Sequence, residues 1–197
     1  MIAWINITLL LLSTALTYYF YVKSVGPAAL EQKIGAVAYP KCGRYRIIAG
    51  VWMTVSIMNY ILYIYYPLPL PLPFRFPWGW PISAAIGLVI ALPSGYLFYR
   101  GMKDAGEETM LPKKEHSLYS GIYEKIRHPQ AAGESVTWLV IALLLNSPFL
   151  TLYSFIWFPI YYGMCVAEER DLMIRYGQAY IEYRDKIGFV WPKKIVK

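Results

Sequence analysis

Four long stretches of the sequence contain no charged side chain, and these stretches limit the possible fold more than any other feature does. They cover residues 1–22, 47–74, 76–99 and 135–167, whereas the 19 Lys and Arg residues and the 12 Asp and Glu residues all lie elsewhere. A helix needs about 20 consecutive apolar residues to cross the hydrocarbon core of a bilayer. Runs of this length therefore exclude an ordinary soluble globular protein, a disordered chain and a disulfide-rich secreted module.

The stretches predict an all-α integral membrane protein with five transmembrane helices. Each of the first three stretches predicts one helix, and the PLPLPLP segment at 67–73 predicts a stiff extended connector, since alternating proline cannot continue a helix. The fourth stretch is too long for one helix, and the Asn-Ser-Pro turn signal at 146–148 predicts a hairpin. Its first helix begins near Pro129 and its second runs past Ala167. We expect residues 1–197 to form a single membrane domain.

The first stretch predicts a retained helix rather than a cleaved signal peptide. A signal peptide needs a basic start, a shorter apolar core and a cleavage site of small residues. Here no Lys or Arg precedes Lys23, and the stretch ends in the aromatic run Tyr-Tyr-Phe-Tyr at 18–21.

The basic residues predict the orientation of the chain. Every Lys and Arg except Arg75 lies between the first and second predicted helices, between the third and fourth, or after the fifth. Because basic loops stay in the cytoplasm, the N-terminus is expected outside and the C-terminus in the cytoplasm, across the cell membrane if the source is prokaryotic. The net charge of +7 then favours membrane lipids over nucleic acid as a partner. Cys42 and Cys165 have no metal-ligand spacing, so no metal site is expected.

Polar chemistry is left to two predicted cytoplasmic segments, 100–134 and 168–197, because the predicted spans contain no proton relay and no paired carboxylates. In the first segment, Arg127 and His128 directly precede Pro129. Proline suits the first position of a helix, and the free N–H groups after it can bind an anion. Two interpretations stay open: a site for the carboxylate or phosphate of a ligand, or a basic anchor on lipid phosphates.

The second segment places a carboxylate on an apolar helical face. Glu168 lies four residues before Leu172, and the spacing is helical for Leu172, Tyr176, Tyr180, Tyr183 and Ile187. The pattern predicts an amphipathic helix that continues the fifth span, with Gly177 inside it at a point of close approach to another backbone or a ligand. A carboxylate on this face needs a partner. Ligand hydroxyls or a cation would serve, and so would Arg127 or Arg175.

Two blocks resemble motifs of the isoprenylcysteine carboxyl methyltransferases and the related small membrane phospholipid methyltransferases. The first motif is close to G-x-Y-x-x-x-R-H-P-x-Y-x-G, and it is matched by Gly121, Tyr123, Arg127, His128, Pro129 and Gly133. The second is E-E-x-x-L-x-x-x-F-G-x-x-Y-x-x-Y with a later proline, and it is matched by Glu168, Glu169, Leu172, Gly177, Tyr180, Tyr183 and Pro192. The resemblance covers roughly residues 100–192.

This resemblance implies an enzyme that takes a methyl group from S-adenosylmethionine and releases S-adenosylhomocysteine, with the cofactor bound within residues 100–192. The cofactor contacts that it implies are His116, Ser117, Leu118, Tyr119, Tyr123, His128, Pro129, Gln130, Ala131 and Glu168. Arg127 and Glu168 are expected nearest the chemistry, as catalytic residues. The chemistry of the cofactor is compatible: a helix start suits its carboxylate, an acidic side chain suits its ribose hydroxyls, and an aromatic ring suits its sulfonium.

The resemblance also implies a lipid-linked acceptor that enters from the bilayer, in the first place the carboxylate of an isoprenylated cysteine. Three positions depart from the motifs: Ala131 replaces a tyrosine, Ile-Gly at 187–188 replaces Val-Pro, and Met164 replaces a basic residue that is thought to hold the substrate carboxylate. A phospholipid N-methyltransferase is therefore the alternative enzyme. A non-enzymatic membrane carrier or scaffold is the alternative from another class.

Overall fold

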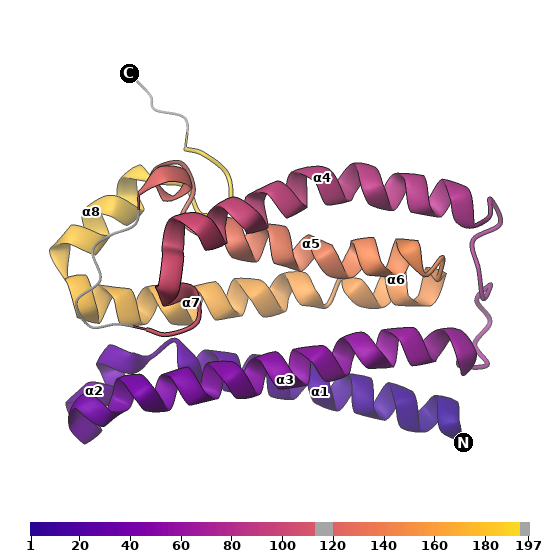
Figure 1. Cartoon of the computed structure of the whole chain (residues 1–197), viewed down its shortest axis with the longest axis horizontal. Coiled ribbons are helices and arrows are strands. Elements are labelled where there is room, and N and C mark those ends of the chain that lie inside the picture. The colour runs from indigo at the N-terminus through magenta and orange to yellow at the C-terminus, as the bar shows by residue number, and fades with distance from the viewer. Residues whose placement is uncertain (113–119, 194–197) are drawn as a thin grey trace.

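The computed structural model describes residues 1–112 and 120–193, and this part of the chain is all-helical, as the hydropathy pattern predicts (Figure 1). In chain order the α-helices are α1 (Ile2–Ser24), α2 (Pro27–Ile34), α3 (Ala38–Tyr65), α4 (Trp80–Ala105), α5 (Pro129–Leu144), α6 (Pro148–Ser154), α7 (Trp157–Tyr176) and α8 (Gln178–Lys186). The connections contain the 3-10 helices η1 (Gly35–Val37), η2 (Gly106–Thr109) and η3 (Gly121–Glu124).

The long helices run side by side along the length of the molecule (Figure 1). Helix α1 packs on α3, α4 packs on α5, and α7 contacts both pairs. Their shared core is aromatic: Trp138 of α5 stacks on Trp157 of α7 with ring centroids 3.8 Å apart, and Tyr60 of α3 lies 5.3 Å from Trp138. Because lipid is as apolar as these side chains, close packing rather than exclusion of water holds such helices together.

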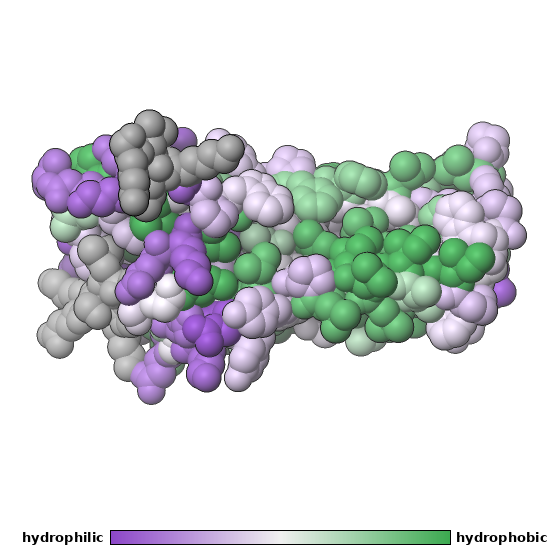
Figure 2. Space-filling model, turned by 90° about the horizontal axis from the view of Figure 1, so that it is seen from above, coloured by the Kyte–Doolittle hydropathy of each residue, from purple (hydrophilic) through white to green (hydrophobic). Residues whose placement is uncertain are grey.

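Four helical stretches are long and apolar enough to span a membrane: Ile2–Ser24, Pro27–Tyr65, Trp80–Thr109 and Pro148–Tyr176. Figure 2 shows hydrophobic residues across the middle of one face and hydrophilic residues gathered at one end. We call that end, which carries α2, α8 and the C-terminal part of α4, the polar end. Helix α5 has 16 residues and is about 24 Å long, so a fifth span stays a prediction.

The second uncharged stretch does not coincide with its helix. Helix α3 begins at Ala38 and ends at Tyr65, so it includes Arg44 and Arg46 and stops before the non-helical residues 67–73. A non-helical connector is therefore confirmed, and its stiff extended conformation stays a prediction. Long basic side chains can keep an apolar stem on the helix while the charged head reaches a polar region, which is why a search for uncharged runs misses the first turns of α3.

The predicted hairpin is confirmed. Helix α5 begins at Pro129, and the turn into α6 contains Asn146, whose φ is 52°. Ser147 caps α6, because its side-chain oxygen accepts a hydrogen bond from the Leu150 N–H at 3.3 Å.

The prediction of one helix through Gly177 is wrong. Helix α7 ends at Tyr176, Gly177 has a φ of 57°, and α8 begins at Gln178. A Cβ at Gly177 would meet nothing within 4 Å, so the left-handed backbone, and not a close approach, requires glycine here. The break lets α8 leave the axis of α7 and lie beside the segment that precedes α5 (Figure 1).

Candidate active site

A cavity opens at the polar end, where α3, α5, α7 and α8 meet. Its empty space is about 790 Å³, counting the part that is open to solvent. Side chains on its wall include Tyr21, Arg46, Glu108, Tyr123, Arg127, His128, Gln130, Ala131, Glu134, Tyr161, Met164, Cys165, Glu168, Tyr180 and Tyr183.

The two motif blocks meet because the C-terminal segment returns to the start of α5. Ile126 and Gly188 form an isolated parallel bridge. The Arg127 N–H donates to the Gly188 carbonyl at 2.8 Å, and the His128 N–H donates to the Phe189 carbonyl at 3.0 Å. These bonds fix the segment that follows α8 against the two residues that precede Pro129.

The Arg127 side chain makes three hydrogen bonds to other groups of the protein. Its Nε donates to Glu169 Oε1 at 2.7 Å, and its Nη1 donates to the Arg184 carbonyl at 2.9 Å and to the Ile187 carbonyl. The guanidinium also lies 5.5 Å from the centre of the Phe189 ring. Only 8% of the side chain is exposed. Arg127 therefore joins α7, α8 and the C-terminal segment at the edge of the cavity.

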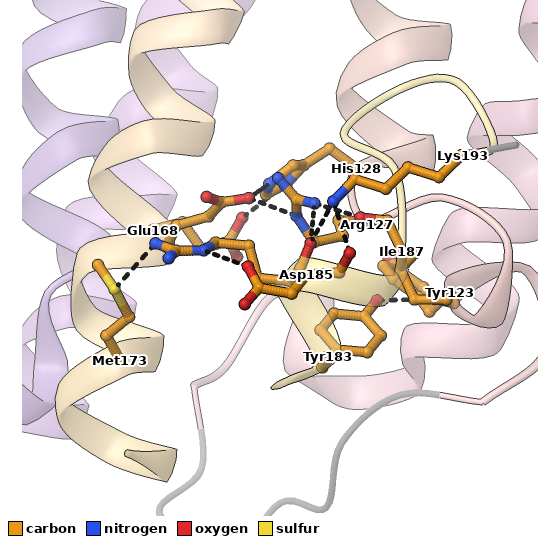
Figure 3. Close-up of polar contacts among 11 residues, drawn as sticks. Tyr123, Arg127, His128, Glu168, Met173, Tyr183, Asp185, Ile187 and Lys193 are labelled. Carbon is orange, nitrogen blue, oxygen red and sulfur yellow. Dashed lines mark hydrogen bonds and ion pairs between the residues drawn. The ribbon is translucent and has the colours of Figure 1, made fainter. Parts of the chain in front are cut away.

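His128 binds both members of the acidic pair (Figure 3). Its Nε2 lies 2.9 Å from Glu169 Oε1, and its Nδ1 lies 3.6 Å from Glu168 Oε2. Burial lowers the pKa of the imidazole, but the contacts with Cys165, Glu168 and Glu169 raise it, and the net result is a pKa well above the ordinary value. His128 therefore carries a positive charge at neutral pH.

Three tyrosines add aromatic rings to the wall. The Tyr123 hydroxyl donates to the Gly101 carbonyl at 3.1 Å, and the Tyr183 hydroxyl donates to the Tyr123 carbonyl at 2.7 Å. The buried Tyr180 hydroxyl has no hydrogen-bond partner among residues 1–112 and 120–193. Burial raises the pKa of all three phenols, that of Tyr183 to about 12, so each is neutral at physiological pH.

The structure brings most of the predicted site residues to this one cavity. Its wall holds Tyr123, Arg127, His128, Gln130, Ala131 and Glu168. Pro129 is buried behind it, where a Cβ added to Gly101 of α4 would come within 3.2 Å of the proline ring. His116, Ser117, Leu118 and Tyr119 lie outside the described residues. No cluster of three potential metal ligands occurs in the described parts of the chain.

Neither of the two arginines that could have paired with Glu168 does so. Arg127 binds Glu169, and Arg175 binds Glu108 at the end of α4. Glu168 instead has its long contact with His128, and 29% of its side chain is exposed. Its carboxylate is thus available to a ligand in the cavity.

The residues that the first half of the chain contributes to the cavity wall were not predicted. Arg46 donates from Nη1 to the carbonyls of Glu108 and Thr109, both at 3.0 Å, and its guanidinium lies 5.5 Å from the centre of the Tyr21 ring. Glu134 of α5 was also missed, although it lies three residues after Ala131 and therefore on a neighbouring helical position.

The wall can bind a ligand that carries both charges and an aromatic part. It offers carboxylates, a protonated imidazole, neutral phenols and the guanidinium of Arg46. The arrangement suits alignment of two bound reactants.

One comparison with known proteins supports this arrangement. Residues 82–179 match the sequence model of the family described as phospholipid methyltransferase. The matched segment starts in α4, contains α5, α6 and α7, and ends at the first turn of α8. No curated protein and no solved structure matches the chain significantly.

Proposed function

Because the segment 82–179 belongs to the phospholipid methyltransferase family, we propose that the protein is an integral membrane methyltransferase that uses S-adenosylmethionine, with this donor bound in the cavity at the polar end. The observation that carries the proposal is that residues of the matched segment line one cavity. The family match runs from α4 to the start of α8, and Tyr123, Arg127, His128 and Glu168 of this segment lie on the cavity wall.

The donor set of the wall fits this cofactor. The carboxylate of Glu168 can accept hydrogen bonds from ribose hydroxyls. The Tyr180 hydroxyl, which has no partner among the described residues, can donate a hydrogen bond to the cofactor or accept one from it. Such a bond would remove the energetic cost of burying a polar group without a partner. The neutral rings of Tyr123 and Tyr183 can face a cation. The N–H groups at the start of α5 can receive a carboxylate.

The chemistry needs little from the protein besides position. When bound, S-adenosylmethionine supplies an activated methyl group on a sulfonium. The residues of the chain hold the donor and the acceptor in line, and they exclude water from the reacting atoms. Arg127 acts in this scheme by holding α8 over the cavity, and Glu168 acts by binding the cofactor.

The acceptor in this proposal is lipid-linked, because a second, uncharged cavity adjoins the first and shares Ala131, Tyr161 and Cys165 with its wall. Its empty space is about 1120 Å³, and its wall is formed by apolar and uncharged residues of α4, α5, α7 and the C-terminal segment. We call it the apolar groove. The motif resemblance favours the carboxylate of an isoprenylated cysteine as the acceptor, and the description of the matched family favours a phospholipid amine.

The same proposal includes five spans, with the N-terminus outside and the site facing the cytoplasm. Two observations support it. The N-terminus and α8 lie at opposite ends of the molecule, which is what an odd number of crossings gives (Figure 1). Helix α5 packs along α4, so the shortest of the five candidate helices has a full-length neighbour.

The proposal is tested first by calorimetric titration of the detergent-purified protein with S-adenosylhomocysteine. We expect binding, and we expect Glu168→Gln to weaken it by about tenfold or more, since a hydrogen bond to a charged group contributes about 1.5–3 kcal/mol. Glu182→Gln on the exposed face of α8 is the matched control and should bind as the wild type does. Absence of binding at near-millimolar ligand would instead favour a carrier or scaffold.

A further inference from the structure

The cofactor cavity and the apolar groove meet at a junction that three residues share. Ala131 of α5 and Tyr161 and Cys165 of α7 line both spaces. Glu134 lines the cofactor cavity at this place, and the next residue along α5, Ser135, lines the groove. An acceptor that reaches the cofactor from the groove therefore passes Glu134.

Glu134 brings a carboxylate to the junction without a cation to balance it. Tyr161 lies near it on the same wall. Among residues 1–112 and 120–193, no Lys, Arg or His lies within ion-pair distance of Glu134. The other acids of the cavity differ in this respect, since Glu168 lies beside His128 and Glu108 binds Arg175.

The nearby cations are already occupied. Arg127 binds Glu169 and two carbonyl groups, and Arg46 binds the carbonyls of Glu108 and Thr109. Residues that line the groove carry no charge at all. Among residues 1–112 and 120–193, the cavity wall thus presents a negative group and no free positive group to the head of a lipid acceptor.

This distribution of charge discriminates between acceptors. A carboxylate acceptor at the junction would face the Glu134 carboxylate at short range in a region of low polarity, where like charges repel strongly. An ammonium group there would gain the partner that Glu134 lacks, and burial of an unpaired carboxylate is costly. The uncharged groove suits the hydrocarbon chains of such a lipid.

We propose that Glu134 selects a lipid that carries an amine and that its carboxylate accepts the proton which the amine must lose before methylation. This inference rests on the proposed function and names the acceptor class of the same site. Glu134 is then a catalytic residue, and the carboxylate of a prenylated cysteine is a poor acceptor.

The proposed step transfers one proton and one methyl group. One proton moves from the acceptor ammonium to the Glu134 carboxylate, which leaves a neutral amine with a free electron pair. That pair forms a bond from nitrogen to the methyl carbon of the donor. The bond from this carbon to sulfur breaks, its electron pair stays on sulfur, and the sulfonium becomes a neutral thioether. The product is a methylated ammonium.

The experiment compares two acceptors that share one chain and differ in head charge. S-farnesylcysteamine ends in an amine, and N-acetyl-S-farnesylcysteine ends in a carboxylate with its nitrogen blocked. Transfer of labelled methyl from S-adenosylmethionine is measured for both, with phosphatidylethanolamine as a third acceptor. We expect methylation of the amines and little methylation of the carboxylate.

Substitution of Glu134 tests the role of the residue. Glu134→Gln should lower the rate with the amine by about a hundredfold, as loss of a general base does. The defect should shrink as the pH rises, because solvent then removes the proton. Affinity for S-adenosylhomocysteine should not change. Glu134→Asp keeps the charge and should retain part of the rate, and Glu124→Gln, an exposed change of the same kind, should retain all of it.

Three results would overturn the inference. The wild type could methylate the carboxylate in preference to the amine. Glu134→Gln could lose S-adenosylhomocysteine affinity in step with activity, which would assign Glu134 to the cofactor. The defect could also be independent of pH, which would indicate a structural role. Failure of the proposed function itself is distinguished by the titration, because the wild type would then not bind S-adenosylhomocysteine at all.

Discussion

Arg127 holds several parts of the candidate site together through contacts within the protein. Its guanidinium donates to Glu169 and to carbonyl groups of residues 184 and 187, which lie 57 and 60 residues away along the chain. A planar donor group with several N–H bonds is suited to this task, and lysine is not. The expectation that Arg127 lies near the chemistry is compatible with its place on the cavity wall. Because its hydrogen bonds go to other groups of the protein, we interpret Arg127 as a positioning residue.

Arg127→Ala should lower the free energy of unfolding by about 3 kcal/mol, because the buried Glu169 carboxylate loses one of its two cationic partners and keeps only His128. Unfolding of the detergent-solubilised protein, followed by circular dichroism, measures this. Arg100→Ala is the matched control, since Arg100 pairs with Asp104 across one helical turn and is partly exposed, so its loss should cost about 0.5 kcal/mol. Equal losses for the two variants would contradict the role assigned to Arg127.

His128 predicts a dependence of stability on pH. The groups that face it are Arg127, Cys165, Glu168 and Glu169, and its net pKa is raised. A raised folded-state pKa means that the stabilisation is complete below the unfolded value of about 6.5 and is lost as pH rises through the folded value. The midpoint of thermal unfolding should therefore fall as the pH rises above about 6.5, and His128→Gln should flatten this decline. A parallel decline in the variant would show that another group titrates.

At the scale of the elements, glycine sets how closely α4 approaches α5. A Cβ added to Gly133 would lie 2.3 Å from the Ser94 carbonyl oxygen, and one added to Gly101 would lie 2.8 Å from the Gln130 nitrogen. Backbones that approach this closely are typical of helix pairs in membranes. The contact fixes the start of α5, and with it His128 and Glu134, relative to the end of α4.

Gly133→Ala should therefore destabilise the protein by about 1–3 kcal/mol, the range for an overpacked contact. Gly95→Ala provides the control on α4, because a Cβ there would meet nothing within 4 Å. That variant should be neutral or slightly stabilising, since alanine is the better helix former. The midpoints of unfolding of the two variants measure the difference, and similar midpoints would mean that α4 and α5 are not in close contact.

At the scale of the whole molecule, the separation of polar and apolar surface predicts the topology. With five spans, the connector 66–79 lies outside and α8 lies in the cytoplasm. In intact cells a membrane-impermeant maleimide should label Leu70→Cys and should label Lys186→Cys only after permeabilisation. Both positions are exposed, and the native Cys42 and Cys165 are buried and provide a low background. Labelling of both variants in intact cells would place residues 70 and 186 on the same side of the membrane, with an even number of crossings between them.

Much of the helical framework can be predicted from local patterns. Hydropathy identified α1, α4 and the hairpin, and the turn and the start of α5 follow from Pro129 and from the Asn-Ser-Pro signal. The bounds of α3 could not be predicted in this way, because its basic residues lie within the helix. The break at Gly177 was also missed, since a glycine inside a helical pattern does not reveal its φ.

The candidate site, like the fold, could be predicted only in part. The sequence by itself determined a helical membrane protein and two blocks of polar residues, because hydropathy and motif spacing are local properties of the chain. Tertiary structure alone decided that Arg127 pairs with Glu169 instead of Glu168 and that Arg46 reaches the cavity from α3. It also decided that Glu134, where the two cavities meet, has no cationic partner among the described residues. Pairing between side chains depends on distances between helices, and residues far apart in sequence set those distances through packing.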